Sequence, residues 1–266
     1  MHAMLNIAVR AARAAGSIIA RGFENRDDLN IETKGLNDFV TKIDKEAEAA
    51  IISKIQESYP DHSFIGEEGS SIKNNPDYTW IIDPLDGTTN FIKGIPHFAV
   101  SIALLHKGKL DQAVVFDPIR GELFAGSKGA GAQLNGYRMR ATKSKDISNA
   151  IVATAFPFRD KGRLEESLQQ FNRIFSQVGD VRRSGSAALD LAYVAAGRYD
   201  GYWEKGLKSW DMAAGELLVK EAGGLITDYD GNNDPLYAEL KQAGSANGIV
   251  AGNPRLVQHI VKQLKA

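Results

Sequence analysis

Apolar residues in the first sixty positions recur at the spacing of amphipathic helices. Between residues 1 and 22 one stripe contains Leu5, Ala8, Ala12, Ala15 and Ile19. Residues 40–59 show the same period of about 3.6, with apolar side chains separated by charged ones. We therefore predict two long helices, over residues 1–22 and 40–59.

The middle and the last parts of the chain alternate short apolar segments with helical patterns. Strands are predicted, several of them bounded by glycine or proline turns, at residues 63–66, 78–82, 98–105, 110–116, 122–125, 199–203 and 248–252, with a further one near Val181. Helices are predicted at residues 164–177, 186–196, 212–222 and 254–264. The polar segment 229–245 is rich in helix breakers and is interpreted as a surface excursion. No internal repeat or linker is evident, which favours one mixed α/β (α+β) domain over residues 1–266.

Composition narrows the class of protein. A chain of 266 residues with 43% hydrophobic and 24% charged side chains can bury a large core. The absence of cysteine excludes disulfides, thiolate nucleophiles and cysteine-ligated metals. A net charge of −1 argues against strong nucleic-acid binding. The apolar runs are too short for a membrane span and the amino terminus lacks a secretory pattern, so we expect a soluble, cytoplasmic protein with no membrane contact.

Residues 80–91 hold the most informative chemistry. An apolar strand runs directly into Asp83 and Asp86, which lie on either side of a proline and are followed by Gly87. This pattern predicts a tight turn that brings two carboxylates together. Like charges repel unless a cation lies between them, and oxygen ligands suit Mg²⁺. The residues after Gly87 resemble the first turn of a helix, which favours an anion such as phosphate. The alternative is an ordinary aspartate cap on a structural helix.

Two further acidic segments have simple explanations when taken singly. Glu67 and Glu68 follow a predicted strand and could be surface charges, and Asp211 begins an apolar helix and could be its cap. The sequence lacks the motifs of other enzyme classes. Its histidines are scattered without metal-binding spacing, and it contains no Gly-x-Ser-x-Gly elbow, P-loop or dinucleotide-binding loop. We therefore favour direct attack by water, without a covalent phospho-enzyme.

Taken together, the segments 66–68, 80–91 and 210–224 resemble the inositol monophosphatase family, and the likeness extends over the whole chain. Residues 186–197 are most similar to the bacterial, extragenic-suppressor type of that family. The resemblance implies a layered αβαβα sugar-phosphatase fold and a homodimer. It also implies lithium-sensitive, Mg²⁺-dependent hydrolysis of inositol monophosphate to myo-inositol and phosphate.

The resemblance also implies the metal ligands and the water-activating pair. Two to three Mg²⁺ ions are expected, with ligands from Glu67, Asp83, the carbonyl of Leu85, Asp86 and Asp211, of which Asp83 bridges two ions. Glu67 also serves a weaker third site. Asp44 and Thr88 are expected to orient and deprotonate the attacking water. The alternative for Asp44 is an exposed helix acid between two lysines.

On the substrate side, the resemblance implies contacts to a small phosphorylated sugar alcohol. These contacts come from Asp86, Gly87, Thr88, Gly185, Ser186, Ala187, Glu204 and Asp211. Lys34 belongs to a segment that resembles the loop closing over the metals. Glu204 could instead be a surface acid beside Lys205, and Lys34 a solvated charge.

Two other functions stay open. A phosphatase of the same superfamily could act on fructose bisphosphate or on a 3′-phosphorylated nucleotide. A regulatory protein could bind RNA polymerase or an elongation factor, with Arg182 and Arg183 as candidate contacts. The more ordinary interpretation of these arginines is an ion pair within the chain or across a dimer.

Overall fold

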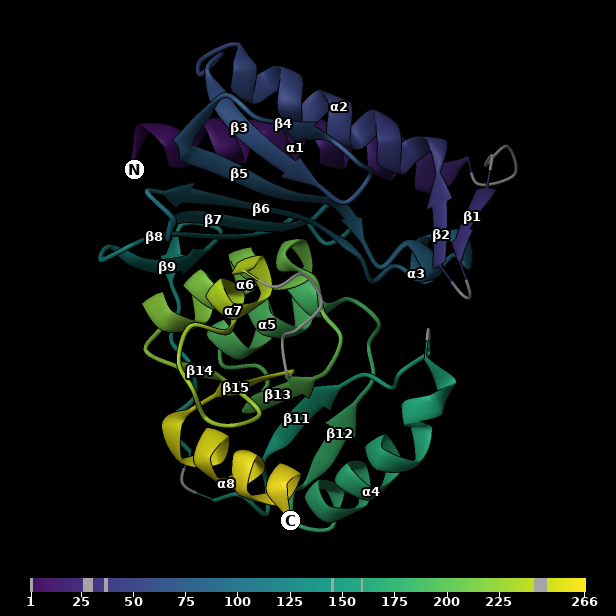
Figure 1. Cartoon of the computed structure of the whole chain (residues 1–266), viewed down its shortest axis with the longest axis vertical. Helices are drawn as coiled ribbons and strands as arrows, with labels where there is room; N and C mark the ends of the chain where they lie inside the picture. Colours follow the sequence, from purple (N-terminus) through teal and green to yellow (C-terminus); the bar gives the residue numbers. More distant parts are fainter. Residues whose placement is uncertain (1, 26–30, 36–37, 145, 159, 242–247) are drawn as a thin grey trace.

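The protein is built of five alternating layers of helices and sheets. The computed structural model describes residues 2–25, 31–35, 38–144, 146–158, 160–241 and 248–266. Figure 1 shows a helix pair, a large sheet, a second group of helices, a smaller sheet and a third helix pair stacked along the long axis. This arrangement confirms the predicted layered αβαβα fold.

The first layer contains the two helices predicted from periodicity, α1 (Ala3–Glu24) and α2 (Lys42–Gln56). By length and composition α1 meets the criteria for a membrane-spanning helix, contrary to the expectation from the sequence. In the fold, however, its alanine-rich stripe is buried against α2 and the large sheet. Small side chains allow this close approach, so α1 packs here as a core helix.

The large sheet has eight strands in the order β10-β9-β8-β7-β6-β5-β3-β4. Its strands are β3 (His62–Gly66), β4 (Ser71–Ile72), β5 (Asn75–Asp86), β6 (Ala99–His106), β7 (Lys109–Asp117), β8 (Glu122–Ser127), β9 (Gly131–Leu134) and β10 (Tyr137–Arg138). Within this sheet, β3 and β5 pair in parallel, and the other pairs between its described strands are antiparallel. A separate hairpin is formed by β1 (Ile31–Gly35) and β2 (Asp38–Thr41). The five strands predicted in this region are confirmed.

Two predicted boundaries near the acidic motif are wrong. Helix α2 begins at Lys42 rather than Val40, because Val40 and Thr41 pair with β1 and Thr41 is the helix cap. Strand β5 continues past Ile82 to Asp86, where the sequence predicted a turn. A shift in its pairing with β6 accommodates the proline, so the aspartates lie in a strand with a β-bulge.

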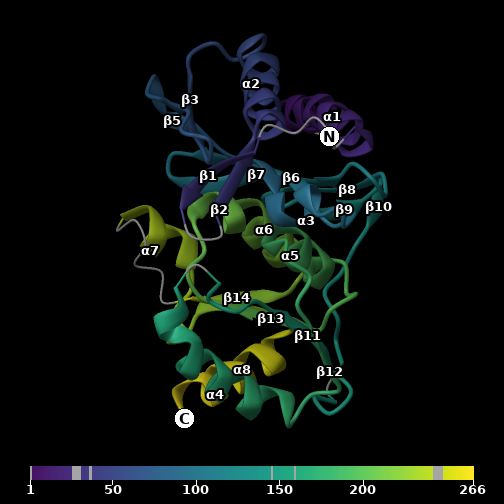
Figure 2. The same cartoon turned by 90° about the vertical axis from the view of Figure 1, so that its right-hand side faces the viewer.

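The central layer contains α5 (Ala187–Ala195) and α6 (Ser209–Glu221), which Figure 2 shows between the two sheets. A short α3 (Thr88–Ile92) follows β5 directly. The interpretation of residues 229–245 as a surface excursion is wrong for α7 (Pro235–Lys241), whose Leu236 is buried and donates its N–H to Glu216. Residues 242–245 of that segment lie outside the described residues.

The second sheet has five strands in the order β12-β11-β13-β15-β14. They are β11 (Ile151–Thr154), β12 (Asp180–Arg182), β13 (Gly201–Glu204), β14 (Leu225–Asp228) and β15 (Ile249–Gly252). The outer helices are α4 (Leu164–Phe175), preceded by the 3₁₀ turn η2 (Lys161–Arg163), and α8 (Pro254–Lys265). The sequence did not predict β11 and β14, which are four-residue strands stabilised by their neighbours.

Candidate active site

Acidic side chains from two distant parts of the chain meet at the end of β5. Ligand oxygens of Asp83, Asp86 and Asp211 all lie within 4.8 Å of one another. Asp83 is 1% exposed. Glu67, at the end of β3, lines the same cavity as these three. The structure therefore brings together the four acids that the sequence singled out.

The bulge in β5 explains how Asp83 and Asp86 face the same way. Residues three apart in a regular strand point to opposite faces of the sheet. Here Asp83 pairs with Ser101 and Asp86 with Ala99, two positions that lie on one face of β6. The Leu85 N–H donates to Asp83 Oδ1 at 3.0 Å and fixes the local turn.

The helix starts of the central layer hold the other two acids of the cluster. Asp86 Oδ2 accepts hydrogen bonds from Ser186 Oγ at 2.6 Å and from the Ala188 N–H at 2.7 Å. Asp211 Oδ2 accepts from the Lys208 N–H at 2.6 Å, within the capping box of α6. Asp211 is thus not the N-cap itself, which is Lys208, but the third residue of α6, whose carboxylate accepts the N–H of the cap and also belongs to the cluster.

Electrostatics favour a cation in this cluster. Burial, reinforced by the nearby charges of Glu67, Asp86 and Asp211, raises the pKa of Asp83 well above its usual value. Burial and the charges of Asp86 and Glu67 likewise raise the pKa of Asp211. Carboxylates that ionise reluctantly when alone become stable ligands beside a cation. The donor set consists of oxygens, which fits a hard divalent ion.

Asp44 reaches the cavity through Thr88. Asp44 is fully buried, with 0% of its surface exposed, so its interpretation as an exposed helix acid is wrong. Thr88 Oγ1 lies 3.0 Å from Asp44 Oδ1 and 3.1 Å from the carbonyl oxygen of Leu85. Burial raises the pKa of Asp44, although hydrogen bonds from Thr41 and Thr88 favour the charged form.

A cavity of about 590 Å³ contains almost all the predicted site residues. These are Glu67, Asp83, Leu85, Asp86, Gly87, Thr88, Gly185, Ser186, Ala187, Glu204 and Asp211. Glu204 also forms a hydrogen bond with the hydroxyl of Tyr202, and Lys205 pairs with Glu166 at 3.1 Å. The backbone of Lys34 lies in β1, but its side chain is outside the described part of the structure.

Sequence reasoning missed several residues that line the cavity. Cationic side chains on its wall are Arg163, Arg183, Lys205 and Lys208, and aromatic ones are Phe39, Phe156 and Phe158. Arg183, considered from the sequence as a partner contact or as part of an ion pair, lies over the Phe158 ring at 5.5 Å. Arg182 instead pairs with Asp180 at 2.5 Å, which confirms the intrachain alternative for that arginine. Within this group, Lys205 and Lys208 follow the predicted site residue Glu204 closely in the sequence, and that position is the signal that could have indicated them.

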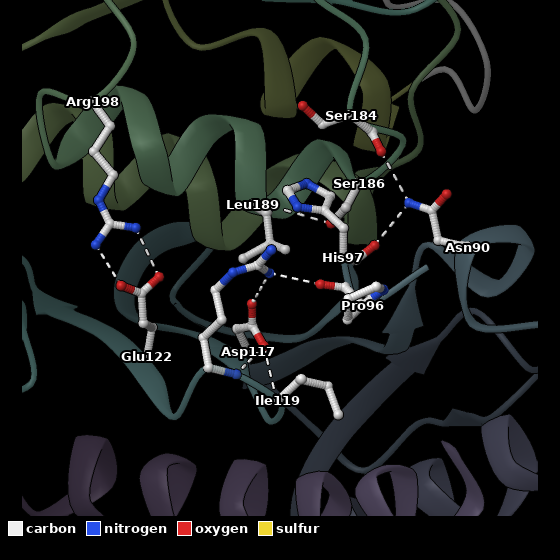
Figure 3. A network of polar contacts seen from close by, with 11 residues as sticks. Asn90, Pro96, His97, Asp117, Ile119, Glu122, Ser184, Ser186, Leu189 and Arg198 are labelled. Atoms are coloured by element: carbon white, nitrogen blue, oxygen red, sulfur yellow. Dashed lines mark hydrogen bonds and ion pairs between the residues drawn. The ribbon is translucent and has the colours of Figure 1, made fainter. Parts of the chain in front are cut away.

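A network of polar contacts joins the helix α3 and the strand β8 to the two ends of α5. Asn90 Nδ2 donates to the carbonyl of His97 at 2.8 Å and to that of Ser184 at 2.9 Å, so α3 is tied to the segment before α5 (Figure 3). At the other end of α5, Arg198 forms an ion pair with Glu122 of β8. These contacts position Ser186 relative to Asp86.

The comparisons with known proteins agree with this geometry. The sequence pattern of the inositol monophosphatase family matches residues 1–266, and the chain belongs to this family. It is 52% identical over 266 residues to the Nus factor SuhB of Escherichia coli (strain K12), covering 100% of this chain and 97% of that one.

Solved structures give the same assignment. The extragenic suppressor protein suhB from Bartonella henselae superposes with a TM-score of 0.94 at 39% identity, over 99% of both chains. The inositol monophosphatase of Anabaena (Nostoc) sp. PCC 7120 gives a TM-score of 0.83 at 35% identity, over 98% of this chain and 94% of that one. The predicted family and its extragenic-suppressor type are therefore confirmed.

Proposed function

We propose that this protein is a Mg²⁺-dependent phosphatase that hydrolyses inositol 1-phosphate to myo-inositol and phosphate. The observation that carries the proposal is the convergence of Asp83, Asp86 and Asp211 in one cavity. The wall of this cavity also contains Thr88, whose hydroxyl donates a hydrogen bond to Asp44. Membership of the inositol monophosphatase family supports a phosphatase. The phosphorylated sugar alcohol and the metal are part of our proposal.

Cations are needed because the cavity repels its substrate without them. Two unit charges about 4 Å apart interact at roughly 4 kcal/mol for an effective dielectric near 20, and a phosphate monoester adds nearly two negative charges. Glu67, Asp83 and the Leu85 carbonyl would hold one ion, and Asp83, Asp86 and Asp211 a second, with a weaker third near Glu67. When bound, such ions lower the pKa of water and neutralise the charge on the leaving oxygen.

Asp44 and Thr88 would orient and deprotonate the attacking water. Thr88 Oγ1 donates its proton towards Asp44, so its lone pairs are left to accept a hydrogen bond from water. As the water oxygen bonds to phosphorus, its proton passes through Thr88 to Asp44. The ester P–O bond breaks at the same time, and the inositol oxygen leaves as an alkoxide that takes up a proton from solvent. The raised pKa of Asp44 makes it a stronger base than an exposed aspartate.

The remaining wall suits a polyol phosphate. The cavity volume of about 590 Å³ lies within the usual range for small-ligand sites. Glu204, Asp86 and the segment Gly185 to Ala187 would contact ring hydroxyls, while Gly87 and Thr88 face the phosphate. Lysine and arginine side chains on the wall would attract the anion. A homodimer in the cytoplasm, with Lys34 on a closing loop, stays a prediction.

Phosphate release tests the proposal. We expect the purified protein to release phosphate from inositol 1-phosphate only with added Mg²⁺, and lithium to inhibit the reaction. Fructose 1,6-bisphosphate and a 3′-phosphorylated nucleotide serve as competing substrates in parallel assays. A higher kcat/KM for either would overturn the substrate assignment, and equal release in EDTA would overturn the metal requirement.

A second candidate function is association with the transcription machinery, supported by the similarity to a protein named a Nus factor. The structure gives less support to Arg182 and Arg183 as contacts for such a partner. Arg182 is paired with Asp180, and Arg183 lines the cavity. Binding of the purified chain and of its Asp83→Asn variant to transcription elongation complexes tests this role. Equal binding by both would separate it from hydrolysis, whereas no binding by either would exclude it.

A further inference from the structure

Helix α2 contains two buried carboxylates one turn apart. Asp44 and Glu48 are 0% and 3% exposed. Acids four residues apart on a helix repel each other, and a buried carboxylate is costly unless donors surround it. Asp44 is satisfied by Thr41 and Thr88. Glu48 must therefore be satisfied by another part of the chain.

The donors to Glu48 come from the turn that follows β3. Glu48 Oε2 accepts the Glu68 N–H at 3.0 Å, and Oε1 accepts the Ser70 N–H at 3.2 Å. A Cβ atom on Gly66 would lie only 2.3 Å from Glu48 Oε2, so the carboxylate lies directly against the glycine backbone. The Gly66 N–H donates to the Ser70 carbonyl at 2.8 Å and closes the turn.

This turn contains Glu67, one of the proposed metal ligands. The Glu67 N–H donates to the Ile82 carbonyl at 3.1 Å, one residue before Asp83. On either side of Glu67, Gly66 touches the Glu48 carboxylate and Glu68 donates to it. The backbone around Glu67 is thus fixed on one side by β5 and on the other by α2. Both carboxylates must be ionised to ligate a cation, and repulsion between ionised Glu67 and Asp83 would, without this support, favour orientations in which Glu67 points away from the cluster.

We propose that Glu48 is a positioning residue for cation binding: by holding the turn 66–70, it presents Glu67 to Asp83 so that both can ligate one ion. The inference rests on the proposed metal-dependent function. Residues that orient metal ligands raise metal affinity by about 10- to 100-fold, because the ligand is already in place before the ion arrives. Glu48 does not touch the reacting atoms.

A matched pair of variants tests this role. Glu221 makes the same type of contact, since its carboxylate accepts the Gly129 N–H at 2.7 Å and the Gly131 N–H at 2.8 Å in a turn between β8 and β9. Glu48→Gln and Glu221→Gln each replace one acceptor oxygen by an amide group. We expect Glu48→Gln to weaken Mg²⁺ binding about 10- to 100-fold in calorimetry, with Glu221→Gln unchanged. In assays, Glu48→Gln should raise the Mg²⁺ concentration for half-maximal rate and leave kcat at saturating Mg²⁺ near that of the unmodified protein.

The outcomes separate the two proposals. If the unmodified protein binds no Mg²⁺, the proposed function fails and this inference fails with it. If the unmodified protein and Glu48→Gln bind Mg²⁺ equally, only the positioning role is overturned. Equal weakening by Glu221→Gln would also overturn it, because the effect would then be general destabilisation. Should Glu48→Gln fail to fold, Glu48→Asp keeps the charge but is too short to reach both amides, and unchanged affinity in that variant would contradict the role.

Discussion

The Thr88 hydroxyl has one proton and two nearby acceptors, the carboxylate of Asp44 and the carbonyl of Leu85. The carboxylate is the stronger acceptor when it is ionised. Ionised Asp44 would therefore direct the proton of Thr88 towards itself and free the Leu85 carbonyl for a cation. The two residues would act as one unit, because Thr88 needs Asp44 to accept its proton and Asp44 reaches the cavity through Thr88.

Asp44→Asn and Thr88→Ala should each lower kcat by about 10²- to 10⁴-fold, the range expected for loss of a general base. The double variant should lose little more than either single variant, because residues that act as a unit are not additive. Single-turnover phosphate release at saturating Mg²⁺ measures this. Glu46→Gln, which alters an exposed acid paired with Lys42 on the same helix, is the control. If the fold-loss in kcat of the double variant equalled the product of the two single losses, the two residues would act independently and the coupling between Asp44 and Thr88 would be contradicted.

Among the helices and strands, the pair α5 and α6 determines how far apart the proposed substrate-binding and metal-binding residues lie. The start of α5 holds Asp86 through Ser186 and Ala188, and the start of α6 contains Asp211. The helices cross closely at Gly215, where an added Cβ would lie 2.5 Å from the Cβ of Leu191. Glycine in a helix lowers the stability of the helix relative to alanine. At position 215, however, the absence of a side chain allows α5 and α6 to pack closely.

Gly215→Ala should destabilise the protein by about 1–3 kcal/mol, because overpacking at Leu191 outweighs the gain of about 1 kcal/mol in helix propensity. Denaturant unfolding measures the change, and phosphate release should fall as α5 and α6 move apart. Leu191→Ala alone should also destabilise the fold. Combined with Gly215→Ala, however, it should cost less than the sum of the two, since the smaller side chain makes room for the new methyl group. Strict additivity would contradict the close-crossing explanation.

For the whole molecule, the buried acid cluster links folding to pH and to metal. The folded-state pKa of Asp83 is raised well above the unfolded value of 3.8, so the folded state keeps a proton that the unfolded state has released. Stability from this group is complete below pH 3.8 and is lost as pH rises through the folded pKa. A cation that binds only the folded state opposes this loss.

In EDTA, the free energy of unfolding of Asp83→Asn should rise relative to the unmodified protein as pH increases from about 4 to 7. Mg²⁺ at about 100 times its Kd should add about 2.7 kcal/mol to the unmodified protein at pH 7.5. This corresponds to a rise in Tm of about 5–10 °C, and the rise should largely disappear in Asp83→Asn. Thermal melts with Mg²⁺ and with EDTA check both points. An equal Mg²⁺ shift in the two proteins would contradict a metal site at Asp83.

Regular patterns along the chain predicted the long helices and the central strands, because an amphipathic face is visible in any sequence window. The hairpin β1–β2 and the strands β4, β9, β10, β11 and β14 were missed. Each of these strands is two to five residues long and depends on a neighbouring strand for its hydrogen bonds. Helix α7 was missed because its apolar contact is with α6, distant in sequence.

The sequence by itself determined which acids were the candidates for the site, since Glu67, Asp83, Asp86 and Asp211 stand in motifs that resemble those of one family. The tertiary structure decided how these acids are oriented and which residues hydrogen-bond to the side chains of the site. Asp44 meets Thr88 across 44 residues, and Asp86 meets Ser186 across 100. Burial and the choice of hydrogen-bond partner depend on segments packed together from far apart, whereas helix and strand periodicity is local. The contacts of Glu48 and the cationic side chains of the cavity wall, on which our proposals rest, are therefore visible only in the folded chain.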